Sequence, residues 1–155
     1  MVDINTGIIY NTTVKKHKIV VDTNVIVAAL KSNAGFSYKL LSIIDDNRFE
    51  VNISVPLILE YEDAIKREKL KIGLTKEDID TLLNYICSIG KERKIYFLWR
   101  PYLKDQKDDM ILEVAVESGS DFIITFNKTD FEGIDKFGVK TLAPKEFLRL
   151  IGEIK

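Results

Sequence analysis

The chain has 155 residues, the size of one ordinary domain that can bury about 70% of the surface of its unfolded form. Its 23 basic and 24 acidic residues give a formal net charge of −1, without the basic excess that marks many nucleic-acid-binding proteins. A hydrophobic content of 46%, with eight glycines and three prolines, excludes low-complexity and intrinsically disordered chains. The single Cys87 cannot form an intramolecular disulfide bond, which favours a reducing compartment.

The chain carries no recognisable targeting or membrane segment. Residues 1–17 lack the apolar core of a signal peptide, and no run approaches the 18 apolar residues of a membrane span. No Ser-, Gly- or Pro-rich linker interrupts the remainder. We therefore expect a cytoplasmic protein with an N-terminal arm over residues 1–17 and one domain over residues 18–155.

Short apolar runs alternate with helix-length segments along the chain. The predicted strands are 18–21, 49–53, 94–98, 121–125 and 138–142. The predicted helices are 24–30, 37–46, 56–69, 76–89, 108–118 and 144–151. The runs KIVV and DFIIT are almost entirely apolar or β-branched, as is typical of strands covered on both faces of a parallel sheet. The sequence thus predicts a three-layer α/β/α domain with a central, mainly parallel sheet of about five strands, which binds ligands at the carboxyl ends of its strands.

Helix 76–89 is predicted to be scaffold. The segment Thr75-Lys76-Glu77-Asp78 resembles a capping box that opens this helix. Apolar residues follow at helical spacing and share one face. They are Ile79, Leu82, Leu83, Ile86 and Ile89.

The first candidate functional residue, Asp22, directly follows strand 18–21, at the expected ligand-binding edge of the sheet. A second interpretation is that Asp22, Thr23 or Asn24 only caps the next helix, because all three residue types accept hydrogen bonds from free helix N–H groups.

A second candidate, Glu60, lies on helix 56–69 and shares a face with Asp63 and Arg67. An exposed acidic residue on an amphipathic helix explains Glu60 equally well. Periodicity does not select Glu60 over Glu62 or Asp63.

Two further groups of oxygen-bearing side chains follow. Asp108 and Asp109 stand in the first turn of helix 108–118, where the helix dipole favours negative charge, and Asp105 has capping spacing to Asp108. Asn127 and Asp130 follow strand 121–125, where an ordinary turn also explains them.

A parallel sheet would bring Asp22, Asp108 and the 127–130 segment to one edge. Carboxylates gathered there repel one another unless a cation joins them or one takes up a proton. A group of oxygen ligands without His or Cys is typical of Mg²⁺ or Mn²⁺ rather than zinc.

The order of these motifs resembles that of the PIN-domain nucleases, in particular the bacterial and archaeal toxin components of toxin–antitoxin pairs. The resemblance covers about residues 18–150. The matching segments are VVDTNV, LILEYEDAIKREKL, DDMILEVAVESGSDFIIT and FNKTDF.

The resemblance implies roles for individual residues. Asp22, Glu60 and Asp108 match the first three metal-binding acidic residues of the family, and Thr23 and Asn24 match the residues that orient the first. Asp108 is preferred over its neighbour because it stands seven residues before a small alanine, as in the family pattern.

The fourth position departs from the commonest pattern. Where many PIN domains have Asp, this chain has Asn127, followed by Asp130. An amide oxygen can bind a hard cation but adds no charge, which leaves open whether one or two metals bind. We expect Asn127 to complete the metal site and Asp130 to orient either the attacking water or the hydration shell of a second metal.

The function implied by the resemblance is a Mg²⁺- or Mn²⁺-dependent endoribonuclease, with RNA as substrate, a small antitoxin protein as partner and a homodimer as assembly. Because of Asn127, a PIN-like RNA-binding module with weakened catalysis is the alternative. A receiver-like phosphotransfer domain is a weaker one, since Glu60 lies on a helix and Lys128 lacks the Pro that follows it in that family.

Basic side chains near the candidate site are possible RNA contacts, although each could equally belong to a solvated charged surface. They are Lys66, Arg67, Arg100 and Lys107.

Overall fold

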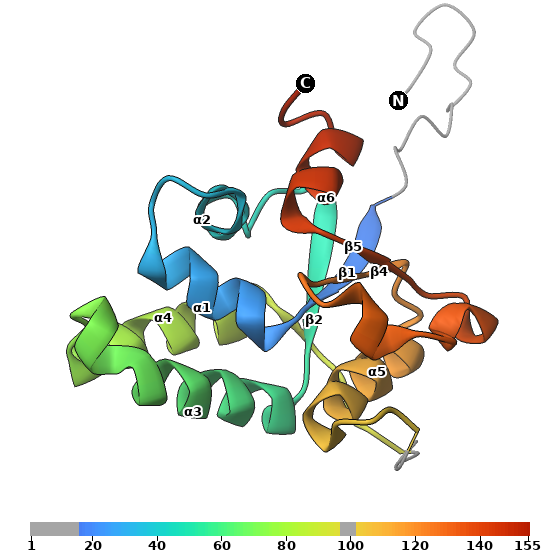
Figure 1. The fold of residues 1–155 in the computed structure, drawn as a ribbon, viewed down its shortest axis with the longest axis horizontal. Helices are drawn as coiled ribbons and strands as arrows, with labels where there is room; N and C mark the ends of the chain where they lie inside the picture. Colours follow the sequence, from blue (N-terminus) through green and yellow to red (C-terminus); the bar gives the residue numbers. More distant parts are fainter. Residues whose placement is uncertain (1–15, 97–101) are drawn as a thin grey trace, which may run out of the picture.

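The computed structural model describes residues 16–96 and 102–155 (Figure 1). The strands are β1 (His17–Val21), β2 (Phe49–Ile53), β3 (Lys91–Glu92), β4 (Phe122–Ile124) and β5 (Lys140–Leu142). The helices are α1 (Thr23–Lys31), α2 (Phe36–Ser42), α3 (Val55–Ile72), α4 (Lys76–Ile89), α5 (Gln106–Ser118) and α6 (Pro144–Leu150). Two 3₁₀ helices, η1 (Lys128–Phe131) and η2 (Ile134–Phe137), lie between β4 and β5.

The five strands form one parallel sheet in the order β3-β2-β1-β4-β5. Val21 pairs with Ile124, so β1 and β4 end side by side. The aliphatic residues of these two central strands are almost inaccessible to solvent, as the runs KIVV and DFIIT predict, whereas Phe122 at the start of β4 is partly buried. Helices surround the sheet (Figure 1), which confirms the three-layer α/β/α prediction.

Helix α3 shows why the local sequence forms its element. Ser54 caps the helix by accepting a hydrogen bond from the amide of Leu57 at 3.2 Å, and a proline lies in the first turn. Gly73 ends the helix with a φ of 76°, a left-handed conformation that glycine adopts without strain. On the inner face, Leu57, Tyr61 and Ile65 are fully buried.

The capping box of α4 is confirmed. Thr75 and Asp78 exchange side-chain to backbone hydrogen bonds of 3.0 and 3.1 Å. Ile79, Leu83 and Ile86 on the predicted apolar face are buried.

The third strand lies at Lys91–Glu92 and not at 94–98 as expected; residues 97 and 98 are outside the described residues. Arg93 explains the position, because its amide donates to the carbonyl of Ile53 and its side chain donates to Asn52 at 2.9 Å. These contacts fix the chain beside the end of β2 three residues before the expected start.

Helix α2 also ends earlier than expected, at Ser42 rather than at residue 46. Asp46 takes part in a turn instead, and its carboxylate accepts hydrogen bonds from the backbone and guanidinium of Arg48 at 2.8 to 2.9 Å. Where a turn over 127–130 is expected, the chain forms the 3₁₀ helix η1, which begins after Asn127 and ends at Phe131.

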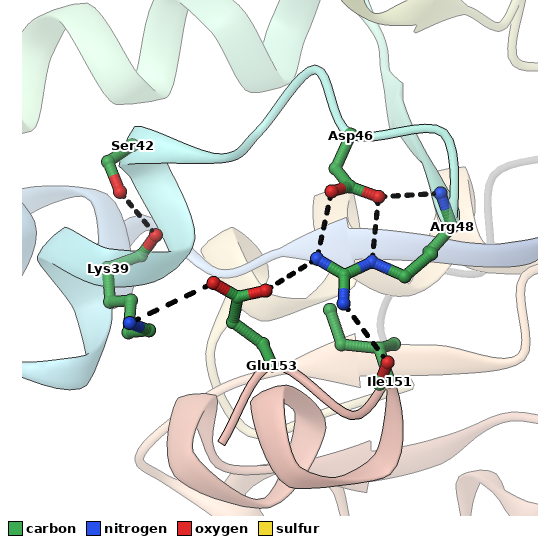
Figure 2. Close-up of polar contacts among 6 residues, drawn as sticks. All are labelled: Lys39, Ser42, Asp46, Arg48, Ile151 and Glu153. Atoms are coloured by element: carbon green, nitrogen blue, oxygen red, sulfur yellow. Dashed lines mark hydrogen bonds and ion pairs between the residues drawn. The ribbon is translucent and has the colours of Figure 1, made fainter.

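A polar cluster at the amino ends of β1 and β2 fastens the C-terminal segment to the fold (Figure 2). Arg48 donates to Glu153 at 2.6 Å and to the carbonyl of Ile151 at 3.2 Å, while Lys39 lies 3.8 Å from Glu153. This cluster is at the edge of the sheet opposite to the ends of β1 and β4. It therefore acts on stability and not on the candidate site.

Most of the predicted N-terminal arm, residues 1–15, lies outside the described residues. His17, the last residue assigned to the arm, opens β1 and packs its ring at centroid distances of 5.8 and 6.4 Å from Phe122 and Phe147. Within the described parts of the chain, none of the helices is both long and apolar enough to cross a membrane.

Candidate active site

A cavity of about 430 Å³ opens where β1 and β4 end and where α1 and α5 begin, and it continues along α3. Seven residues singled out from the sequence for catalysis, metal binding or support line it together. They are Asp22, Thr23, Asn24, Glu60, Asp108, Asn127 and Asp130. The fold thus brings to one place residues that are up to 108 positions apart in the sequence.

Asp22 lies on the floor of this cavity and is only 5% exposed. Its carboxylate makes no standard capping hydrogen bond to α1, although the amides of Thr23 and Asn24 in the first turn interact with it. One carboxylate oxygen also accepts a hydrogen bond from the hydroxyl of Thr125 at 2.7 Å, so capping alone does not account for this residue. Burial raises the pKa of Asp22, and the hydrogen bond from Thr125 partly opposes this rise.

Thr125 links the two strand ends that form the floor. Its hydroxyl donates to Asp22 on the β1 side and accepts from the amide of Asn127, at 3.0 Å, on the β4 side. Below it, the hydroxyl of the fully buried Tyr61 donates to the carbonyl of Val21. These contacts fix the backbone and carboxylate of Asp22 in one position.

Asp108 faces the cavity from the first turn of α5, where it is partly exposed. Burial, followed by repulsion from the carboxylates of Asp22, Asp105, Asp130 and Asp109, raises the pKa of Asp108 to about 7. Two of these carboxylates, Asp22 and Asp130, come from other elements of the fold, so the repulsion is a property of the assembled cavity.

The neighbouring acidic residues Asp105 and Asp109 have structural contacts. Asp105 caps α5 by accepting from the amide of Lys107 at 2.9 Å. Asp109 is completely buried and accepts from the amide of Leu103 at 2.8 Å. Of the two consecutive carboxylates at 108 and 109, only Asp108 lines the cavity.

Glu60 lies across the cavity on α3 and is nearly buried. One of its carboxylate oxygens is 3.5 Å from a guanidinium nitrogen of Arg67 and 3.7 Å from the ammonium nitrogen of Lys107. The negative charge of Glu60 is therefore already balanced by two cations, one from α3 and one from α5.

The basic residues predicted as RNA contacts occupy different places. Arg67 and Lys107 line the cavity. Lys66, the neighbour of Arg67, is not among the lining residues and pairs with Glu62 at 3.4 Å. Arg100 lies outside the described residues.

The donor set fits a hard divalent cation. Carboxylate oxygens of Asp22 and Asp108 face one cavity with the amide of Asn24, whose side-chain oxygen is buried without a hydrogen-bond partner in the described structure. Within the described residues, no three His, Cys, Asp or Glu side chains are arranged to hold an ion as they lie. An ion would therefore have to draw these side chains inward.

Sequence reasoning missed Thr125 and the residues of the α1 and α3 surfaces that extend the cavity. Thr125 ends a buried run, and its position beside Asp22 follows only from the pairing of β4 with β1. Lys31, Ala28 and Ala64 also line the cavity, although nothing in their local sequence indicates a ligand site.

The observations so far define a parallel α/β protein with an acidic cavity at the carboxyl edge of its sheet. Residues 18–129 match the PIN domain family, and the chain belongs to this family. PIN domains are generally nucleases that use divalent metals. No curated protein is similar enough in sequence to match the chain.

The fold is similar to a chain in the crystal structure of VapBC2 from Rickettsia felis bound to a DNA fragment from its promoter. The TM-score is 0.56 at 16% sequence identity, and the alignment covers 81% of this chain and 98% of the other. At this identity the likeness supports the fold.

Replacing Thr125 with valine is expected to lower the free energy of unfolding by about 2 kcal/mol, because the buried Asp22 would lose a hydrogen-bond donor. Urea unfolding at pH 7 measures this effect. Thr125→Ser keeps the hydroxyl and should recover most of the loss, whereas equal stabilities of the valine variant and the wild type would contradict the assigned hydrogen bond.

Proposed function

We propose that this protein is a metal-dependent endoribonuclease that uses Mg²⁺ or Mn²⁺ and hydrolyses phosphodiester bonds of RNA. The observation that carries the proposal is the acidic cavity, in which Asp22, Glu60 and Asp108 from three different elements face the same space. Membership of the PIN family makes a nuclease the function that best explains this cavity.

In the proposed site, Asp22, Glu60, Asp108 and the amide oxygen of Asn127 hold the ion. When bound, the ion neutralises charge on the phosphate and makes a water molecule more acidic. Thr125 holds Asp22 in place through its 2.7 Å hydrogen bond. Thr23 and Asn24, directly after Asp22, support its position.

Two groups of side chains would act on the substrate. Asp130, in η1 at the cavity, would orient the attacking water. Arg67 and Lys107, each less than 4 Å from Glu60, would exchange this partner for a substrate phosphate when Glu60 turns to the ion.

Metal addition to the purified protein tests the site before any substrate is involved. A ligand that binds only the native state stabilises it by about 2.7 kcal/mol at one hundred times its dissociation constant. We expect Mn²⁺ to raise the midpoint of thermal unfolding and a chelator to reverse the rise. An unchanged midpoint at millimolar Mn²⁺ would contradict the proposed metal site.

A PIN-like RNA-binding module with weak catalysis is the second candidate. It is favoured by the amide of Asn127 where many PIN domains have a carboxylate, and by the cations that already pair with Glu60. Incubating labelled RNA with Mn²⁺ separates the two candidates. A nuclease cuts the RNA, whereas a binding module retains it intact.

We further propose that the protein is a cytoplasmic toxin of a toxin–antitoxin pair that a small antitoxin protein inhibits. The similarity of the fold to a chain in the VapBC2 structure supports this assignment. Co-expression with the product of a small neighbouring gene should restore growth if the isolated protein is toxic. Light scattering of the purified protein tests the homodimer that the family resemblance suggests.

A further inference from the structure

The cavity continues beyond its acidic end as a groove between α1 and α3, which run side by side (Figure 1). Lining residues recur at intervals of three or four along both helices, so each helix presents one face to the groove. They include Asn24, Ala28 and Lys31 on α1 and Glu60, Ala64 and Arg67 on α3. At 1.5 Å per residue, the α1 side of the groove spans about 10 Å.

The far end of the groove is closed by an ion pair between the two helices. The ammonium nitrogen of Lys31 lies 3.3 Å from a carboxylate oxygen of Glu68, and both residues line the cavity. The near end is the acidic site around Asp22. The groove is therefore bounded by charged groups at both ends.

The middle of the groove is apolar and open because its side chains are short. Val27, Ala28 and Ala64 line this part, and a longer side chain at either alanine would fill it. A cavity of about 430 Å³ is within the range of sites that bind small organic ligands. It is far too small to admit a nucleic-acid duplex.

The basic residues at the two ends of the groove match a single nucleic-acid strand, in which one phosphate lies on each side of the sugar and base. Arg67 and Lys107 lie beside Glu60 at the acidic end, and Lys31 lies at the far end. Their ion pairs are 3.3 to 3.7 Å long and involve cationic side chains that are about half exposed. The Lys31–Glu68 pair is partly exposed on both sides and contributes little to stability, so a phosphate can replace its carboxylate at low cost. Glu60 is nearly buried, so Arg67 and Lys107 become available to a phosphate only when Glu60 turns to the ion.

We propose that this α1–α3 groove binds the nucleotide next to the scissile phosphate of a single-stranded RNA. The base or ribose of this nucleotide lies against Ala28 and Ala64, and its outer phosphate is bound by Lys31. This inference rests on the proposed nuclease function, because the acidic end of the cavity must hold the reacting phosphate.

Nuclear magnetic resonance tests the subsite without relying on catalysis. The ¹⁵N-labelled protein is titrated with inorganic phosphate or with adenosine 5′-monophosphate, both in the presence of Mg²⁺. Phosphate should shift amide signals at the two charged ends of the groove, near Asp22 and Asp108 and near Lys31, but not those of its apolar middle. The nucleotide should in addition shift those of Ala28 and Ala64, and identical shifts with the two probes would overturn the proposal.

Filling the groove supplies the second test. Ala28 is only partly buried, so Ala28→Leu can place its larger side chain in the open groove without repacking the core. We expect the KM for a single-stranded RNA to rise at least tenfold and the nucleotide-specific signal shifts to disappear. The stabilisation by Mn²⁺ should stay unchanged, and a wild-type KM would contradict the subsite.

Charge variants and a second filling variant complete the design. Arg67→Gln should weaken RNA binding, whereas Lys66→Gln, at the next position but outside the cavity, should not. Ala64→Leu fills the groove from the opposite helix and should also raise the KM; because Ala64 is only 7% exposed, urea unfolding must first show that this variant is as stable as the wild type. If wild-type protein neither gains stability with Mn²⁺ nor cuts RNA, the proposed function fails. If it does both and the groove variants behave as wild type, the subsite alone fails.

Discussion

The Asp108→Asn variant should be more stable than the wild type without metal, yet gain nothing from Mn²⁺ and cut RNA at least about 100-fold more slowly. The reason lies in the pKa of Asp108, which burial and the surrounding carboxylates raise to about 7. At pH 7.5 much of the carboxyl group is ionised among like charges, and the neutral amide removes this repulsion.

The size of the stabilisation follows from the same pKa. One pKa unit corresponds to about 1.4 kcal/mol, but solvent screens the partly exposed Asp108, so we expect a gain of about 1 to 2 kcal/mol. Urea unfolding in the presence of a chelator measures it. Such a gain would mean that the carboxylate needed for metal binding lowers the stability of the metal-free protein, as is common for functional sites.

An exposed acidic residue on α3 outside the cavity provides the control. Asp63→Asn also removes one negative charge, but it should change neither the stability without metal nor the response to Mn²⁺. If Asp108→Asn binds Mn²⁺ and cuts RNA as the wild type does, Asp108 is not part of the site. If it loses metal binding without any gain in stability, the assigned repulsion is wrong.

The sequence predicts the two central strands and the edge of the sheet at which the acidic residues gather. The apolar runs around Ile19 and Ile123 indicate buried parallel strands, and this topology alone brings Asp22 and Asn127 to one edge. The edge strand was misplaced because the contacts of Arg93 with Asn52 and Ile53 fix its position, and such contacts join segments 40 residues apart.

The sequence was not sufficient to predict what surrounds each carboxylate. Arg67 is about two helical turns from Glu60 on the same face of α3, so this ion pair could be expected, but Lys107 reaches Glu60 only through the packing of α5 near α3. The groove depends on the absence of large side chains at Ala28 and Ala64, two residues that most often signify close helix packing. Whether short side chains leave space or allow contact is decided by the distance between the helices.

The affinity for Mn²⁺ should fall steeply as the pH is lowered below 7. Metal ligands bind in the ionised form, and the pKa values of Asp22 and Asp108 are both raised, the latter to about 7. Each unit below pH 7 should therefore weaken binding about tenfold, because one proton must leave Asp108 when the ion binds. Between pH 7 and 8, Asp108 passes from about half to almost fully ionised, so the dissociation constant should change by only about twofold.

Stability without metal should respond to pH in the opposite sense. A carboxyl group whose pKa is higher in the folded than in the unfolded protein destabilises the fold once it ionises in the unfolded chain, so stability declines as the pH rises from about 4 to 7. Saturating Mn²⁺ should reverse the trend over the upper part of this range, because metal binding strengthens as the protons leave.

Calorimetric titration with Mn²⁺ at pH 5, 6, 7 and 8 measures both the affinity and the protons released. Asp108→Asn should flatten the pH dependence of its metal-free stability, whereas Asp63→Asn should leave the wild-type curve unchanged. Asp46 does not contribute to this pH dependence, because its hydrogen bonds with Arg48 lower its pKa and keep it ionised between pH 5 and 8. A dissociation constant that is the same at pH 5 and pH 7 would rule out ionised Asp108 as a ligand of the ion.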